Sequence, residues 1–163
     1  DLHKSSHSFP TRRSSDLMYG PGDTFDPERS HVIAAIIKKI YEAKRDGKDT
    51  IEVWGTGSVS REFLFVKDGV EGIILATEKY DKERPVNIGA GREITIKELV
   101  ETIAKLMDFQ GKIIWDSSKP DGQPRRCLDI SRAKEEFGFV AQKDLVEGLK
   151  ETIEWYKNNP ITL

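Results

Sequence analysis

The spacing of apolar residues along the chain predicts several amphipathic helices. Between residues 31 and 47, in "HVIAAIIKKIYEAKRDG", apolar residues recur three and four positions apart, as on one buried helix face. Ser30 precedes this segment as an N-cap and Gly47 follows it as a stop. Further helices are expected over 67–80, over 96–107 behind a capping box of Thr95 and Glu98, between the cap Ser131 and Gly138, and over 145–159 behind Asp144.

Strands are expected where short runs are rich in β-branched and aromatic residues. These runs are "TIEVWG" at 50–55, "REFLFV" at 61–66, "PVNIG" at 85–89 and "KIIWD" at 112–116. They are too few and too scattered for a complete doubly wound sheet. The pattern therefore predicts a mixed α/β chain with more helices than strands, typical of part of an α/β protein.

Residues 1–17, "DLHKSSHSFPTRRSSDL", differ from the rest of the chain. They are rich in serine and basic residues and have no apolar periodicity, so we expect a disordered tail. The segment resembles translated adapter or vector sequence, and we interpret it as non-native. His3 and His7 stand four residues apart, but nothing around them favours the helix on which they would share a metal. Residues 18–163 form the expected domain.

Composition narrows the classes of partner. The chain has 163 residues, 37% hydrophobic and 33% charged, which suits one soluble globular domain. A formal net charge of -2 provides no long-range attraction for nucleic acid or an anionic membrane, and no apolar run has the length of a membrane span. The single cysteine, Cys127, excludes an internal disulfide and suits the cytoplasm. We expect no metal site. Because the net charge is slightly negative, an anion-binding site would need a local cluster of cations.

One such cluster lies in "DSSKPDGQPRRCLD", residues 116–129. Prolines and a glycine make this segment a turn-rich loop, in which Lys119, Arg125 and Arg126 can converge without the fixed spacing of a helix. A planar guanidinium group suits two phosphate oxygens at once. The alternative is a solvated loop whose arginines are neutralised by Asp121 and Asp129.

Four motifs in order carry a family resemblance. They are "MYGPGDTFDPERSHVIAAIIKK", "VWGTGSVSREFLFVKDGVEGIILATE", "PVNIGAGREITIKELVETIA" and "SSKPDGQPRRCLDISRAKEEFGF". Together they resemble the C-terminal half of the extended short-chain dehydrogenases that act on nucleotide sugars, and most of all the GDP-L-fucose synthase group. The resemblance implies the C-terminal part of an extended Rossmann-type enzyme, a helix-rich substrate domain with a few short strands.

The same resemblance implies an activity for the parent protein. That activity is the NADP-dependent epimerisation and reduction of GDP-4-keto-6-deoxy-D-mannose to GDP-L-fucose, in a cytoplasmic homodimer with a GDP-sugar as substrate. Two features of the family have no match in this sequence, namely the glycine-rich turn that binds the dinucleotide and a tyrosine followed four residues later by lysine. We therefore expect a fragment that lacks the cofactor domain and is inactive alone.

Site residues carry over by matching positions. His31 corresponds to an acid/base of the 3,5-epimerisation and, with Met18 and Tyr19, to the cofactor-binding segment. Lys39, Trp54, Arg61 and Asp121 correspond to substrate contacts, and Arg125 and Arg126 lie on the loop that closes over the nucleotide sugar.

Each of these residues also has a simpler explanation. Trp54 suits core packing in a strand, Arg61 a surface ion pair, and His31 an ordinary helix start. Lys38 competes with Lys39 for the substrate contact.

Two alternative functions remain open at this point. One is a UDP- or dTDP-sugar epimerase or dehydratase of the same family, and the other is a stand-alone, non-catalytic module that binds sugar nucleotides. The resemblance further implies that segments 85–89 and 69–78 pack against the cofactor-domain sheet. Without that sheet we expect an exposed edge strand, an exposed apolar helix face and poor solubility.

Overall fold

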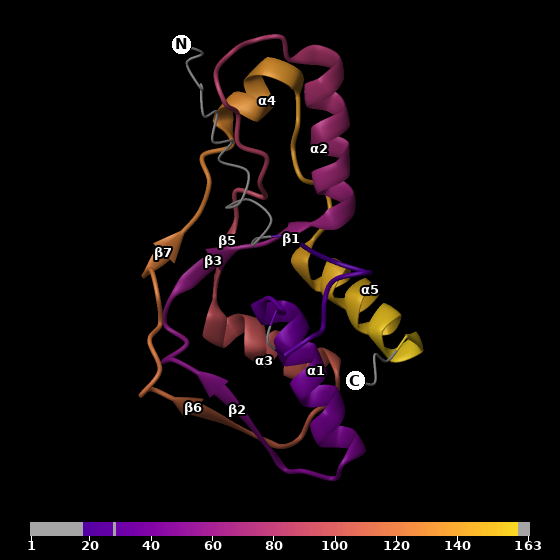
Figure 1. The fold of residues 1–163 in the computed structure, drawn as a ribbon, viewed down its shortest axis with the longest axis vertical. Coiled ribbons are helices and arrows are strands. Elements are labelled where there is room, and N and C mark those ends of the chain that lie inside the picture. The colour runs from indigo at the N-terminus through magenta and orange to yellow at the C-terminus, as the bar shows by residue number, and fades with distance from the viewer. Residues whose placement is uncertain (1–17, 28, 160–163) are drawn as a thin grey trace, which may run out of the picture.

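The computed structural model describes residues 18–27 and 29–159 of the chain. Five helices stand out in the described part: α1 (Val32–Arg45), α2 (Val66–Lys79), α3 (Ile96–Leu106), α4 (Ser131–Phe137) and α5 (Leu145–Asn158). Figure 1 shows α2 and α4 at one end of an elongated molecule, and α1, α3 and the β2–β6 pair at the other. None of the described helices is long and apolar enough to cross a membrane.

The strands are short and form three small sheets. They are β1 (Met18–Tyr19), β2 (Thr50–Trp54), β3 (Ser60–Glu62), β4 (Leu64–Phe65), β5 (Glu93–Thr95), β6 (Lys112–Asp116) and β7 (Arg125–Arg126). β1 pairs with β4 and β2 with β6, both in parallel. In the third sheet β3 is central, antiparallel to β5 and parallel to β7. The α/β architecture expected from the sequence is confirmed.

Helix α1 forms because its apolar residues share one face. Ile33, Ile37 and Ile40 are buried in the main core. The helix ends with Lys44 and Arg45 in its last turn, where the helix dipole favours cations. The predicted cap Ser30 is wrong by one residue: the N-cap is His31, whose side chain makes no capping hydrogen bond.

The other helix boundaries were predicted more closely. The capping box is confirmed, since Thr95 accepts a hydrogen bond from the Glu98 backbone and Glu98 accepts one from the Thr95 backbone. Asp144 caps α5 through the Val146 N–H. Ser131 does not cap α4 but is its first helical residue, and the Asp129 carboxylate accepts a hydrogen bond from its N–H at 2.9 Å.

Two of the predicted strands are wrong. The run 61–66 is split at Phe63 into β3 and β4, which belong to different sheets, and Val66 already begins α2. The run 85–89 is not a strand, because among the described residues its backbone finds no strand partner. Its side chains are used instead: Ile88 packs directly over Gly72 of α2.

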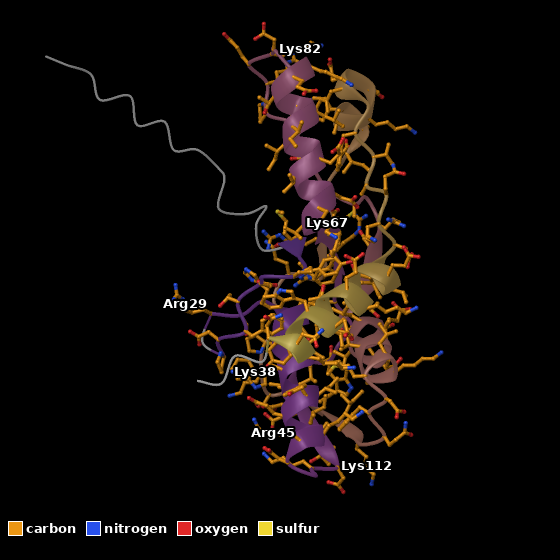
Figure 2. The ribbon with its side chains drawn as sticks, turned by 90° about the vertical axis from the view of Figure 1, so that its right-hand side faces the viewer. Arg29, Lys38, Arg45, Lys67, Lys82 and Lys112 are labelled. Carbon is orange, nitrogen blue, oxygen red and sulfur yellow. The ribbon has the colours of Figure 1, made fainter. Side chains whose placement is uncertain are left out.

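The core has two parts. The larger one gathers buried residues of α1, α3, α5 and β2, and the smaller one packs Leu64, Phe137 and Phe139 beneath α2 and α4. Helix α2 meets the smaller core through Gly69 and Gly72, so its isoleucines lie on the opposite side. Val70, Ile73 and Ile74 are exposed, and this confirms the expected apolar helix face. Figure 2 views α2 from the side turned away from α4, between Lys67 and Lys82.

Candidate functional site

A cavity of about 240 Å³ opens where the end of β2, strand β3 and the loop before β7 meet. Its apolar lining comes from the starts of α1 and α3 and from the chain around β3, and its polar lining comes from β3, β7 and the loop 116–124. The lining residues are Val32, Trp54, Gly57, Val59, Arg61, Phe63, Ile96, Pro120, Asp121 and Arg126.

Two guanidinium groups share this cavity because of strand register. Arg61 of β3 lies opposite Arg126 of β7 in the parallel ladder, and both side chains line the cavity. Arg61 donates to the backbone carbonyls of Ser60 at 2.7 Å and Asp121 at 3.4 Å. Burial and the neighbouring Arg126 charge lower the pKa of Arg61, in part offset by Asp121. An anion placed between the two groups would relieve this repulsion.

Asp121 fastens the loop to the turn after β2. Its Oδ1 accepts a hydrogen bond from the Thr56 N–H and its Oδ2 one from the Thr56 hydroxyl, both at 2.7 Å. These two bonds lower the pKa of the Asp121 carboxyl, which keeps it ionised. Gly55 is required at this contact, because its φ is +86° and a Cβ there would overlap the carboxylate.

Trp54 stands at the mouth of the cavity with 64% of its surface exposed. Core packing, the simpler explanation for this residue, is therefore wrong. In β2 the buried residues are Ile51 and Val53, and strand alternation turns Trp54 outward. The ammonium group of Lys39 lies 5.9 Å from the centre of the indole ring and that of Lys119 lies 5.6 Å from it.

Adjacent basic residues turn out to face different ways. Lys39 reaches Trp54 and also donates to the Glu52 carbonyl, whereas Lys38 is buried on α1 and faces Glu42 at 3.9 Å. Arg126 lines the cavity, whereas Arg125 donates to the Glu93 carboxylate of β5 at 3.0 Å.

The structure thus brings four of the predicted substrate residues to one cavity and places Lys39 against its rim. These four are Trp54, Arg61, Asp121 and Arg126. Arg125 lies outside the cavity, because side chains alternate along β7.

A second pocket, of about 260 Å³, collects the predicted cofactor and acid/base residues. Its lining residues are Met18, Tyr19, Gly20, Pro21, Gly22, Asp23, His31 and Val66. His31 immediately precedes Val32 of the first cavity, so the start of α1 borders both hollows. The Tyr19 hydroxyl is directed away into the core, where it donates to the Leu145 carbonyl, and burial raises its pKa.

The cysteine and the acidic residues form neither a nucleophilic thiolate nor a metal site in the described part of the chain. Burial and the nearby Glu62 raise the pKa of Cys127 to about 12, so it stays a thiol rather than a nucleophilic thiolate. In the part of the chain that the structure describes, no three His, Cys, Asp or Glu side chains gather as metal ligands would.

Sequence reasoning missed two kinds of residue around these hollows. The apolar lining of Val32, Val59, Phe63 and Ile96 has no motif and is recognised only once the elements are assembled. Asp23 was missed although it follows "YGPG", a segment already matched to the family. Its place in the His31 pocket is a result of the loop conformation.

Comparison with known sequences gives a consistent family. Residues 15–89 match the NAD dependent epimerase/dehydratase family. The chain is 47% identical over 145 residues to "Probable GDP-L-fucose synthase 1" of Oryza sativa subsp. japonica, covering 89% of this chain and 44% of that protein. It is 38% identical over 151 residues to GDP-L-fucose synthase of Escherichia coli (strain K12), covering 87% and 47%. The chain therefore spans somewhat under half the length of these relatives.

Solved structures share the fold. A GDP-L-fucose synthetase of Naegleria fowleri bound to NADP superposes with a TM-score of 0.82 at 26% identity, over 87% of this chain and 44% of that one. A UDP-glucose 4-epimerase of Thermotoga maritima superposes at 0.75 and 27% identity, over the same shares. The family resemblance and the Rossmann-type fold class predicted from the sequence are confirmed. The roles assigned to individual site residues stay predictions.

Proposed function

We propose that the chain supplies the sugar-nucleotide site of an NADP-dependent epimerase-reductase that converts GDP-4-keto-6-deoxy-D-mannose to GDP-L-fucose. The observation that carries this proposal is the pair Arg61 and Arg126, which line one cavity beside the exposed ring of Trp54. The similarity of this chain to GDP-L-fucose synthases supports this particular reaction among those of the family.

The diphosphate binds between the two arginines. A hydrogen bond to a charged group contributes about 1.5–3 kcal/mol, so a guanidinium pair dominates the recognition of a diphosphate. Burial and the charge of Arg126 lower the pKa of Arg61, and the ligand also relieves the repulsion between the two guanidinium groups. Lys39 and Lys119 at the Trp54 ring add positive charge at the rim, and the indole face offers a surface for a base or sugar ring.

The hexose extends toward His31, past the start of α1. Epimerisation next to a ketone moves one proton between a sugar carbon and a protein group, and imidazole is suited to this near neutral pH. The pocket lined by Met18, Tyr19 and His31 would hold the nicotinamide end of NADP, and Gly20 and Gly22 leave part of its wall free of side chains. When bound there, NADPH would supply the hydride that reduces the ketone.

The remaining proposals concern the parent protein. It works as a cytoplasmic homodimer, as the family resemblance implies. The single cysteine of this chain is compatible with a reducing compartment. A UDP-sugar enzyme is the second candidate, because a UDP-glucose 4-epimerase also shares the fold.

Calorimetric titration of the chain with GDP-L-fucose and with UDP-glucose tests the proposal. We expect measurable binding of GDP-L-fucose and weaker binding of UDP-glucose. Tighter binding of UDP-glucose would favour the second candidate. Absence of binding for both ligands, with the chain shown to be folded by circular dichroism, would overturn the assignment of this cavity.

A further inference from the structure

One carboxylate oxygen near His31 has no partner within the described structure. Asp23 lies in the loop between β1 and α1 and lines the same pocket as His31. Its Oδ1 accepts a hydrogen bond from the Thr24 N–H at 2.7 Å. Its Oδ2 is buried and makes no hydrogen bond to any described residue. A buried acceptor without a hydrogen bond lowers the stability of the fold by about 1–3 kcal/mol. Such an atom is therefore expected to find a donor when the protein functions.

The loop holds this carboxylate in place. Asp23 donates its own N–H to the Gly20 carbonyl at 3.3 Å, which closes a turn. Two residues further on, Phe25 is fully buried and stacks on Tyr156 of α5 with ring centres 4.2 Å apart. The backbone around Asp23 is therefore fixed on both sides, and the hydrogen bond from the Thr24 N–H to Oδ1 orients its carboxylate.

His31 shares the pocket with this carboxylate, and its charge acts on it. Burial raises the pKa of Asp23, whereas the Thr24 hydrogen bond and the charge of His31 lower it. The other titratable side chain lining the pocket is Tyr19 of β1, whose hydroxyl is committed to the Leu145 carbonyl. Helix α2 contributes only the apolar Val66 to the pocket.

We propose that Asp23 is a positioning residue for His31, with Oδ2 accepting a hydrogen bond that the imidazole ring donates once it turns toward the carboxylate. In the described structure Oδ2 has no hydrogen-bond partner, and the shared pocket is what brings the two side chains together. The bond from the imidazole fixes the ring and its tautomer and stabilises the protonated imidazole. The role given to Asp23 rests on the proposed function, in which one proton passes between a His31 nitrogen and the sugar carbon next to the ketone. The electron pair of the C–H bond resides on the enolate meanwhile, and Asp23 stays ionised throughout.

Titration of His31 by NMR tests the proposal without any turnover. The ring signals are assigned by their loss in His31→Gln, which separates them from those of His3 and His7. In Asp23→Asn we expect the His31 ring to lose its proton at a lower pH than in the wild-type chain, as for removal of a nearby opposite charge. Asp46→Asn removes the same charge at the far end of α1, beside Arg45, and is expected to leave the titration unchanged.

An unchanged His31 titration in folded Asp23→Asn would overturn the proposal. If that variant does not fold, the wild-type chain decides, because a histidine at a helix N-terminus without a carboxylate partner titrates at or below the ordinary value of about 6.5. A value above that supports the pair and a value at or below it contradicts it. A failure of the chain to bind GDP-L-fucose, by contrast, would contradict the proposed function but would not change the titration result.

Discussion

At the residue scale, the distinction between Arg125 and Arg126 decides what the cation cluster does. The two are adjacent in sequence, yet Arg126 lines the cavity with Arg61 and Arg125 pairs with Glu93 on the other face of β7. The sequence predicted a phosphate-binding loop here but not which arginine serves it. That choice depends on the pairing of β7 with β3, which no local pattern in a turn-rich loop indicates.

Replacing Arg61 by glutamine should weaken the binding of GDP-L-fucose by roughly tenfold or more. The substitution removes a charge-assisted hydrogen bond to the diphosphate. A loss of about 1.4 kcal/mol in binding free energy raises the dissociation constant tenfold. Arg125→Gln is the matched control and should change the affinity little. Titration calorimetry measures both, and equal losses in the two variants would mean a general charge effect rather than a site.

Glu62 shows how a carboxylate can serve the fold instead of the chemistry. Its side chain is fully buried, and its two oxygens accept hydrogen bonds from the Ala90 N–H at 2.8 Å and the Leu128 N–H at 2.7 Å. It thereby ties β3 to two segments on either side of it. Gly89 is needed beside it, since a Cβ there would overlap the carboxylate.

We expect Glu62→Gln to lower the free energy of unfolding by about 2–3 kcal/mol. An amide has one acceptor oxygen, so one backbone N–H would face an NH₂ group without a partner in the core. Urea unfolding followed by circular dichroism measures the loss. The exposed Glu71→Gln of α2 serves as control, and a similar effect from both substitutions would contradict the role given to Glu62.

At the scale of elements, the helices follow from the sequence and the short strands do not. Helical periodicity and the caps Thr95 and Asp144 are local properties, so they were predicted correctly. β1, β5 and β7 have only two or three residues each and exist because a partner strand lies beside them. Segment 85–89 is the converse case, a strand-like sequence whose backbone has no strand beside it in the described structure.

Removing the capping box should destabilise α3. Thr95→Ala deletes a side chain that caps the Glu98 N–H, and we expect a loss of about 1 kcal/mol in the free energy of unfolding. Thr77→Ala, in the exposed face of α2, is a control expected to have a smaller effect. Thermal unfolding of the two variants compares them directly, and equal losses would contradict the cap.

The same box predicts a dependence on pH. Hydrogen bonds from Thr95 lower the pKa of Glu98 below its usual value. A carboxyl with a lowered pKa stabilises the fold above its unfolded-state pKa and loses this effect as the pH falls through the folded one. The stability difference between wild type and Thr95→Ala should therefore shrink in acid, below about pH 4. A constant difference down to pH 3 in thermal unfolding would contradict this account.

At the scale of the whole molecule, α2 is arranged with its glycines inward and its large apolar residues outward. Gly69 and Gly72 pack against the small core, while Val70, Ile73 and Ile74 are 49%, 56% and 46% exposed. A contiguous apolar stripe of this kind favours association. The chain also spans less than half the length of the GDP-L-fucose synthases of Oryza sativa and Escherichia coli to which it is similar.

We expect the chain to self-associate as its concentration rises, and Ile73→Lys to reduce this by placing a charge in the stripe. Val140→Lys is a suitable control, because Val140 is also exposed but belongs to the loop after α4 and not to α2. Sedimentation velocity over a range of concentrations measures the effect. A sharp, concentration-independent monomer for the wild-type chain would contradict the prediction.

The central claim is that one cavity, between β2, β3 and β7, holds the diphosphate of a GDP-sugar. A crystal structure of the chain with GDP-L-fucose tests it most directly. The account predicts density for the diphosphate between Arg61 and Arg126, a ring of the ligand against Trp54, and the sugar directed toward His31. Density for the ligand at any other surface, with this cavity empty, would contradict it.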